Sequence, residues 1–334
     1  MVAQLESTDR HLLNIVQSSF PLVSRPFEDI GRELGVTEEE TMARVAALKK
    51  SNVLRQISAI FDSRRLGYKT SLVAMRFPQE RLTKAAHHSN KHDGVSHNYA
   101  RNSHLNLWFT LAVPPHEDRS QTVERLGQET NAEAVRMMPT LRFFKIGVNF
   151  DMQAEETASH CNGVSNSNKA IPHDWNVAEA VSEFEVEVIC ELQEDLPVCP
   201  SPFLDMAHRL GITEDDLFSY ARAFQERGIM RRYGAVLHHR RAGFRANGMA
   251  VWKVPPERSE EVGQIMAAHP AVTHCYERPT FPDWPYTHFS MIHATSKARC
   301  EEIAGEISQQ TGISDYQMLY SSREYKKTRV RYFA

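Results

Sequence analysis

The chain opens with apolar residues at helical spacing and then changes to strand-like alternation. Leu12 and Val16 fall on one face of a helix that ends near residue 17, and Pro26 suits the first turn of a second helix. Thr37 can cap a third helix, and residues 53–61 then alternate between apolar and polar as in a β-hairpin wing. Three helices followed by a wing predict a winged helix-turn-helix domain.

A longer pattern of strands and helices follows the wing. Its order is strand, helix, strand, strand, helix, strand, and the elements are expected at residues 69–77, 79–91, 94–101, 105–113, 117–129 and 135–148. This is the βαββαβ order of the ferredoxin-like fold, an antiparallel sheet with helices on one face. We therefore predict an α+β protein.

The second half of the chain repeats the first. The sequence L-G-V-T-E-E-E at residues 34–40 matches L-G-I-T-E-D-D at residues 210–216. A second winged helix is therefore predicted at residues 178–237, with ferredoxin-like elements at residues 245–254, 257–268, 271–278, 287–295, 297–310 and 315–333. We expect a tandem duplication whose domains span residues 1–62, 63–151, 177–238 and 239–334, with a polar linker at 152–176.

Composition narrows the class of protein. The 334 residues are 41% hydrophobic and carry a net charge of −3, so the chain lacks the basic character of a general nucleic-acid binder. Five cysteines form no C-x-x-C pair, which argues against a structural zinc site and a disulfide framework. No apolar run has the length of a membrane span and no signal pattern opens the chain, so we expect a cytoplasmic protein.

One triplet of polar residues occurs in both halves. The sequence V-T-H-C-Y-E-R places His274, Tyr276 and Arg278 at alternate positions, and V-S-H-N-Y-A-R does the same for a second set, His97, Tyr99 and Arg101. Alternate side chains of a strand share one face, so each set would point into one space. The simpler interpretation is a half-buried strand whose polar residues face solvent, and the repetition by itself shows common ancestry rather than function.

Basic residues concentrate in two places although the chain as a whole is slightly acidic. One is the stretch 231–241, and the other is the C-terminal stretch 323–331. The helices that should read DNA begin instead with acids, at residues 38–40 and 214–216, which repel phosphate. A small molecule rich in carboxylates fits this placement better than DNA does, whereas the simpler interpretation is a solvated charged hairpin.

These features resemble the siroheme decarboxylase family, which is related to the Lrp/AsnC-type transcription regulators. In the second half the resemblance rests on R-R-Y-G-A-V-L-H-H-R-R-A-G-F, V-T-H-C-Y-E-R-P and S-R-E-Y-K-K-T-R-V-R-Y-F. The first half, with F-P-L-V-S-R-P-F and V-S-H-N-Y-A-R-N-S-H-L-N-L-W-F-T-L, looks like the partner subunit of that family. Together they cover nearly all of the chain outside the linker.

The resemblance implies a reaction. Siroheme would lose the carboxyl groups of its acetates at ring positions 12 and 18, giving 12,18-didecarboxysiroheme and two CO2. The fused arrangement favours the heme d1 branch, which serves cytochrome cd1 nitrite reductase in denitrification, over the siroheme-dependent route to heme. No cofactor beyond the iron of siroheme and no DNA or membrane partner are implied. The alternatives are a ligand-responsive regulator of the Lrp/AsnC type and a non-catalytic tetrapyrrole carrier.

The resemblance also suggests roles for the residues. His274 is expected as proton donor or iron ligand, Tyr276 as a relay or orienting hydroxyl, and Arg278 as the clamp on an acetate, with His238 as the rival iron ligand. The first-half triplet is expected to face a counterpart cavity. The expected substrate-binding residues are Arg231, Arg232, His238, His239, Arg240, Arg241, Trp284, Tyr286, Arg323, Lys326, Lys327, Arg329, Arg142 and Lys145.

The two halves differ in their basic residues. The first half has Asp62 and Ser63 where the second has His238 and His239, so we expect the second half to supply the principal pocket. If the halves keep the pairing of the regulators, they associate through their sheets. Further homodimerisation is left open.

Overall fold

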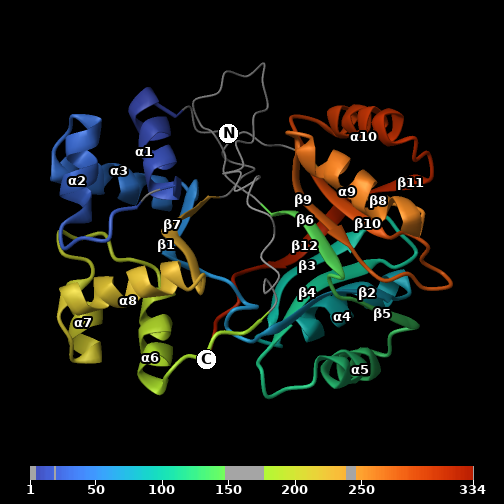
Figure 1. The fold of residues 1–334 in the computed structure, drawn as a ribbon, viewed down its shortest axis with the longest axis horizontal. Coiled ribbons are helices and arrows are strands. Elements are labelled where there is room, and N and C mark those ends of the chain that lie inside the picture. The colour runs from blue at the N-terminus through green and yellow to red at the C-terminus, as the bar shows by residue number, and fades with distance from the viewer. Residues whose placement is uncertain (1–4, 19, 147–176, 238–245, 334) are drawn as a thin grey trace.

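The computed structural model describes residues 5–18, 20–146, 177–237 and 246–333, which form two lobes (Figure 1). One lobe holds the winged-helix elements of both halves. They are α1 (Ser7–Ser18), α2 (Pro26–Leu34), α3 (Glu38–Lys50), β1 (Leu54–Phe61), α6 (Glu183–Leu192), α7 (Leu204–Leu210), α8 (Glu214–Glu226) and β7 (Met230–Leu237).

Local signals place these helices where the sequence predicts them. Pro26 opens α2, and Gly35 ends it with a φ of 72°, a conformation that glycine adopts without strain. The side chain of Thr37 accepts a hydrogen bond from the backbone N–H of Glu40 and caps α3. Leu12 and Val16 are fully buried in a core to which both halves contribute. The winged-helix prediction is confirmed.

The wings differ from the prediction. The described residues contain no hairpin in either wing, because β1 and β7 are single strands that pair with each other antiparallel, with Ala59 opposite Tyr233. Both strands thereby satisfy backbone groups that a local hairpin would have paired. The wings thus join the two halves.

The second lobe contains two antiparallel sheets of five strands each. The first-half elements are β2 (Lys69–Arg76), α4 (Gln79–Ser89), β3 (Val95–Arg101), β4 (Leu107–Val113), α5 (Arg119–Thr130), β5 (Ala134–Met138) and β6 (Arg142–Ile146). The second-half elements are β8 (Ala246–Trp252), α9 (Ser259–Ala268), β9 (Val272–Glu277), β10 (His288–Ala294), α10 (Lys297–Thr311), β11 (Tyr316–Leu319) and β12 (Ser321–Lys327), and a 3-10 turn, Pro256–Arg258, precedes α9.

The last strand of each half lies in the sheet of the other half. The strand orders are β12-β3-β4-β2-β5 and β11-β8-β10-β9-β6. The predictions of single strands at 135–148 and 315–333 were therefore wrong, since each region bends after its first strand and crosses over. In the first half the break contains Pro139, which has no N–H to continue a ladder. The expected pairing of the halves through their sheets is confirmed, and it takes the form of a reciprocal strand exchange.

Among the described residues, each sheet is covered by helices on one face only. Helices α4 and α5 cover the first sheet, and α9 and α10 cover the second (Figure 1). The uncovered faces meet through a cluster of apolar side chains that includes Trp108, Met249, Trp284 and Phe289. This contact leaves open the parts of both faces that lie toward the wings. In the part of the chain that the structure describes, no helix is long and apolar enough to span a membrane.

Candidate active site

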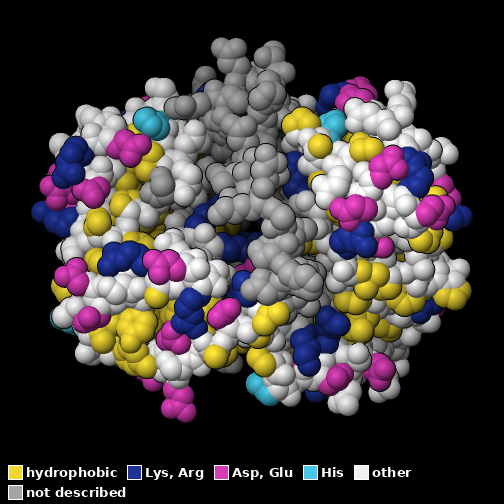
Figure 2. Space-filling view, viewed as in Figure 1, with side chains coloured by type: hydrophobic (Ala, Val, Ile, Leu, Met, Phe, Trp, Pro, Cys, Tyr) yellow, Lys and Arg dark blue, Asp and Glu magenta, His cyan; other side chains and the backbone are white. Residues whose placement is uncertain are grey.

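A cavity of about 1580 Å³ lies between the β1–β7 pair and the uncovered faces of both sheets. Figure 2 shows Lys and Arg side chains in the hollow between the lobes. Among the described lining residues, three are acidic and eleven are basic, namely Arg55, Arg64, Lys69, Arg101, Arg119, Arg231, Arg232, Arg278, Lys327, Arg329 and Arg331. Such an excess of positive charge in a partly enclosed space favours a polyanionic ligand.

Both triplets reach this one cavity. His97, Tyr99 and Arg101 enter from β3, and the second-half triplet enters from β9. The prediction that the two sets face separate cavities was therefore wrong. The uncovered faces of the two sheets meet in one interface, so the duplicated positions converge on one space.

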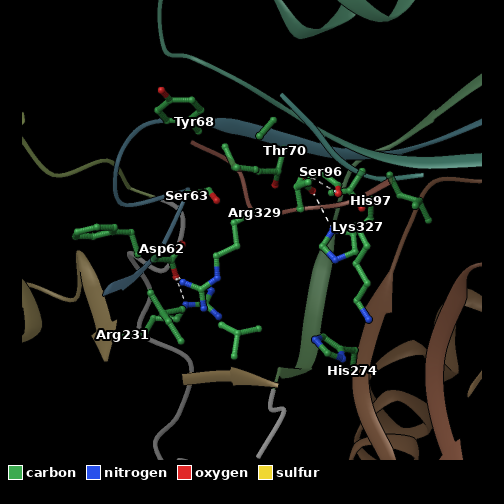
Figure 3. Close-up of a pocket in the computed structure, with 18 of the residues that line it drawn as sticks. Asp62, Ser63, Tyr68, Thr70, Ser96, His97, Arg231, His274, Lys327 and Arg329 are labelled. Carbon is green, nitrogen blue, oxygen red and sulfur yellow. Dashed lines mark hydrogen bonds and ion pairs between the residues drawn. The ribbon is translucent and has the colours of Figure 1, made fainter. Parts of the chain in front are cut away.

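The two histidines have matching environments. The Nδ1 of His97 lies 3.0 Å from the hydroxyl of Ser96, and the Nδ1 of His274 lies 2.9 Å from the hydroxyl of Thr273. With Nδ1 engaged, Nε2 is the nitrogen left for an occupant of the cavity. Figure 3 shows Lys327 extending from beside His97 toward His274.

Burial keeps both imidazoles neutral. It lowers the pKa of His97 to about 4, and the positive charges of Lys327 and Arg55 lower it further. Burial likewise lowers the pKa of His274 to about 3, with added effects from His293 and Arg231. A neutral imidazole at pH 7 can bind a metal ion or accept a proton.

Arg101 and Arg278 donate hydrogen bonds to the backbone at the points where the chain leaves one sheet and crosses to the other. Arg278 donates from Nη1 to the carbonyl of Met138, the last residue of β5, at 2.5 Å. Arg101 donates to the carbonyl of Leu319, the last residue of β11, at 3.1 Å. Each guanidinium also lies over the tyrosine of its own triplet, 4.9 Å from the ring centroid for Arg278.

Arg278 is a buried cation, and Arg101 is a half-buried residue whose Nε is buried. Among the described residues no carboxylate forms an ion pair with Arg101 or Arg278, and the Nε of each has no hydrogen-bond partner there. Burial lowers the pKa of both to about 10, so they stay charged at neutral pH. A buried cation without an anion is costly, and a ligand carboxylate would supply the missing partner.

A carboxylate already occupies one corner of the cavity. Asp62 accepts a hydrogen bond from Arg64 Nη2 at 2.7 Å. It accepts another from Arg231 Nη2 at 2.8 Å (Figure 3). Burial opposes ionisation, but Arg64 and Arg231 hold the pKa of Asp62 below its usual range. Arg231 therefore lines the cavity and is also engaged by Asp62 across the two wings.

The segment after β12 forms another wall of the cavity. Thr328 donates its N–H to the carbonyl of Ser96 at 2.7 Å, and Arg329 donates to the Ser58 hydroxyl and the Ala59 carbonyl, both at 3.0 Å. Tyr332 then docks in the winged-helix lobe, where its hydroxyl lies 2.6 Å from that of Ser63. Lys327 at the end of β12 and Arg329 in the following segment thereby both reach the cavity.

Several predicted substrate-binding residues lie elsewhere. Trp284 and Tyr286 pack in the apolar cluster between the sheets, because their rings fill the interface there. Outside the lining are also the basic residues Arg323, Lys326, Arg142 and Lys145. Arg142 pairs with Glu260, and Lys326 donates to the carbonyls of Asn90 and His92. His238, His239, Arg240 and Arg241 lie outside the described residues.

Two further residues that line the cavity were not predicted from the sequence. His293 on β10 and Arg55 on β1 both reach the cavity. The signal for His293 was its position two residues beyond Met291, on the same face of a strand that pairs with β9. Arg55 carried no such signal, because its place depends on the pairing of the two wings.

Comparison with known proteins agrees with this fold. An AsnC-like ligand binding domain model matches residues 65–145 and 241–326, and a siroheme decarboxylase NirDL-like HTH domain model matches residues 9–55 and 185–231. The chain is therefore a fused, duplicated protein of winged-helix and AsnC-like domains. It belongs to the siroheme decarboxylase family, since it is 36% identical over 324 residues to a siroheme decarboxylase of Hydrogenobacter thermophilus, covering 97% of this chain and 94% of that protein.

Two further relatives extend the likeness. A siroheme decarboxylase beta subunit of Methanosarcina barkeri is 46% identical over 147 residues, which cover 44% of this chain and 97% of that subunit. A crystal structure of the siroheme decarboxylase NirDL in complex with an iron-uroporphyrin III analogue has a TM-score of 0.73 and 31% identity, covering 98% of this chain and 95% of that one. Half-length subunits and fused chains thus both resemble this protein.

Proposed function

We propose that this protein is a carboxy-lyase that converts siroheme to 12,18-didecarboxysiroheme and two CO2, in cytoplasmic heme d1 or siroheme-dependent heme biosynthesis. The observation that carries the proposal is a single cavity in which eleven basic side chains surround two neutral imidazoles. Siroheme combines many carboxylates with an iron that accepts an imidazole ligand. Family membership supports the same reaction.

The cavity residues have different roles in this reaction, according to their chemistry. Lys327, Arg329 and Arg232 bind the carboxylates that do not react, and Arg101 and Arg278 each hold a reacting acetate in position. The C–C bond to the carboxylate breaks, and its electron pair passes to the methylene carbon and the conjugated ring. A proton then completes the methyl group, and CO2 leaves. His274 or His97 serves as the iron ligand or, once the carboxylates of the bound substrate raise the pKa of its ring, as the acid that supplies this proton.

The test is direct incubation. Purified protein is mixed with siroheme under anaerobic conditions, and the pigment is followed by its visible spectrum and by mass spectrometry. We expect a product lighter by two CO2 units. A bound pigment of unchanged mass would indicate a tetrapyrrole carrier instead. Tight, sequence-selective binding to duplex DNA at physiological salt, with siroheme unchanged, would indicate a regulator.

The winged-helix lobe gives little support to the alternative that this protein is a DNA-binding transcription regulator. In α3, Arg44 pairs with Glu6, Asp9 and Glu40, and Lys49 pairs with Asp195. Basic side chains that are neutralised within the protein contribute little to phosphate binding. The lobe serves instead to pair the wings and to close one side of the cavity.

Two neighbouring lysines of β12 provide a matched test of the carboxylate anchors. Lys327 lines the cavity, whereas Lys326 points to the opposite side of the strand and donates to backbone carbonyls. We expect Lys327→Ala to weaken siroheme binding roughly 10- to 100-fold, the range for a lost hydrogen bond to a charged group. Lys326→Ala should change the affinity less than about twofold, within the usual range for a surface position. Titration of the siroheme spectrum measures both, and equal effects would contradict the assignment.

A further inference from the structure

Residues 328–333, which follow β12, form a strap that connects the two lobes. At one end Thr328 donates its N–H to the carbonyl of Ser96 in β3, at 2.7 Å, and near the other end Tyr332 lies in the core of the winged-helix lobe. The strap belongs to neither a helix nor a strand. Its path is therefore fixed by the contacts of its individual residues rather than by a ladder of backbone hydrogen bonds.

Tyr332 is the buried residue of the strap, with 8% of its surface exposed. Its ring packs edge-to-face against Phe61 and Tyr68, with centroids 6.2 and 5.1 Å away. Its hydroxyl lies 2.6 Å from that of Ser63. These neighbours come from the end of β1 and from the link between β1 and β2, so Tyr332 contacts the first half where its winged helix passes into its sheet.

The backbone of Tyr332 is held by the second half. Gln193, which follows α6, accepts the N–H of Tyr332 on Oε1 at 2.8 Å and donates from Nε2 to its carbonyl at 3.0 Å. This pair of bonds imitates the exchange between two opposite residues of an antiparallel strand pair. The contacts of Tyr332 together define a socket, made of Phe61, Ser63, Tyr68 and Gln193.

Two cavity cations precede this anchor, and their backbones are held differently. Figure 3 shows Lys327 and Arg329 extending into the cavity from the same wall. Lys327 is the last residue of β12 and pairs with His97 in β3, so the sheet fixes its position. Arg329 lies outside the sheet, three residues before Tyr332. Its Nη1 donates to a hydroxyl and a carbonyl of β1, which leaves the other N–H groups of the guanidinium for a ligand.

We propose that Tyr332 is a positioning residue for siroheme binding, because its anchoring in the socket holds Arg329 where the guanidinium can meet a substrate carboxylate. The proposal rests on the proposed function, which assigns Arg329 to carboxylates that do not react. An arginine that is already held in place binds a carboxylate at a smaller cost in conformational entropy. Lys327 does not depend on the socket, because β12 holds it.

The rate of siroheme decarboxylation in Tyr332→Ala, measured anaerobically over a range of siroheme concentrations, tests the proposal. We expect KM to rise roughly 5- to 20-fold, within the range for losing a hydrogen bond to a charged group. The kcat should change by less than about twofold, because the weakened contact binds substrate and transition state alike. Loss of folded protein alone would lower the apparent kcat and leave KM unchanged. Tyr332→Phe keeps the ring and backbone contacts and should return KM to within about threefold of the wild type.

Double substitutions identify the residue through which Tyr332 acts. In Arg329→Ala, which already lacks the guanidinium, the addition of Tyr332→Ala should raise KM by less than about twofold. In Lys327→Ala the same addition should have its full effect, since the two positions contribute independently. Full additivity with Arg329→Ala, or a wild-type KM in Tyr332→Ala, would overturn the proposal.

Gln193→Ala repeats the test without removing a buried ring, and it decides the matter if Tyr332→Ala does not fold. It deletes both bonds to the backbone of Tyr332, so KM should rise, but not in the Arg329→Ala background. A wild-type KM in Gln193→Ala would equally overturn the proposal. Tyr325→Ala is the matched control, since Tyr325 lies on β12 outside the cavity lining, with its hydroxyl 3.2 Å from that of Thr83, and its KM should stay that of the wild type. Failure of the wild-type protein to release CO2 would instead overturn the proposed function.

Discussion

Turnover of siroheme should fall by roughly 10²- to 10⁴-fold in His274→Ala and, separately, in His97→Ala, the range for loss of a group that transfers a proton in the transition state. Both imidazoles line the cavity, are neutral, and have Nδ1 engaged by the preceding hydroxyl. Alanine opens space toward an existing cavity and is tolerated in a strand, so the variants should fold. Single-turnover assays measure the rate, and circular dichroism checks the fold.

The visible spectrum separates the two roles. Loss of an iron ligand shifts the spectrum of bound siroheme, whereas loss of a proton donor leaves it unchanged. Thr273→Val is the matched control, since it keeps the His274 ring and removes only its hydroxyl partner, and we expect a smaller loss of about 10- to 100-fold. Wild-type turnover in both alanine variants would exclude the triplets from the chemistry.

The Arg278→Met substitution should weaken siroheme binding while leaving the free energy of unfolding of the ligand-free protein nearly unchanged. Arg278 is a buried cation whose guanidinium donates one hydrogen bond, to the carbonyl of Met138, and which has no carboxylate partner among the described residues. Relief of the buried charge opposes the loss of that bond, so the free energy of unfolding without ligand should change by no more than about 1 kcal/mol. Siroheme binding should weaken by about 2–5 kcal/mol, the cost of removing one partner of a buried charge pair. Arg101→Met should behave in the same way.

Urea unfolding and siroheme titration test this prediction together. Arg142→Met is the control, because Arg142 pairs with Glu260 and lies outside the cavity lining, so its variant should bind siroheme normally. If Arg278→Met instead loses stability and keeps its affinity, the arginine serves only to hold the strand crossover.

The sequence predicted those features that local patterns determine. The helix start at Pro26, the cap at Thr37, the order of strands and helices, and the alternation that aims each triplet at one face depend on neighbouring residues, and the structure has them. Pairing between distant segments was not predictable in this way. The exchange of β6 and β12 and the joining of the wings depend on contacts between the halves.

The same limit explains the predicted site residues that the structure places elsewhere. Basic character in a strand does not tell which face a side chain takes, so Lys326 and Lys327 were predicted alike although only Lys327 lines the cavity. An aromatic residue between prolines resembles a binding loop, yet Trp284 fills the contact between the sheets. Both placements arise because burial is settled by the partner surface rather than by the residue itself.

The strand exchange also sets the order in which the protein can be completed during synthesis. The ribosome makes β2 to β5 first, but the edge of that sheet at β3 pairs with β12, which is made only after the strands β8 to β11 of the second half. Until then β3 presents unpaired backbone groups along His97, Asn98 and Tyr99, a surface to which other extended chains can add. Because β3 also carries the first triplet, this side of the active site is finished only after β12 has been made.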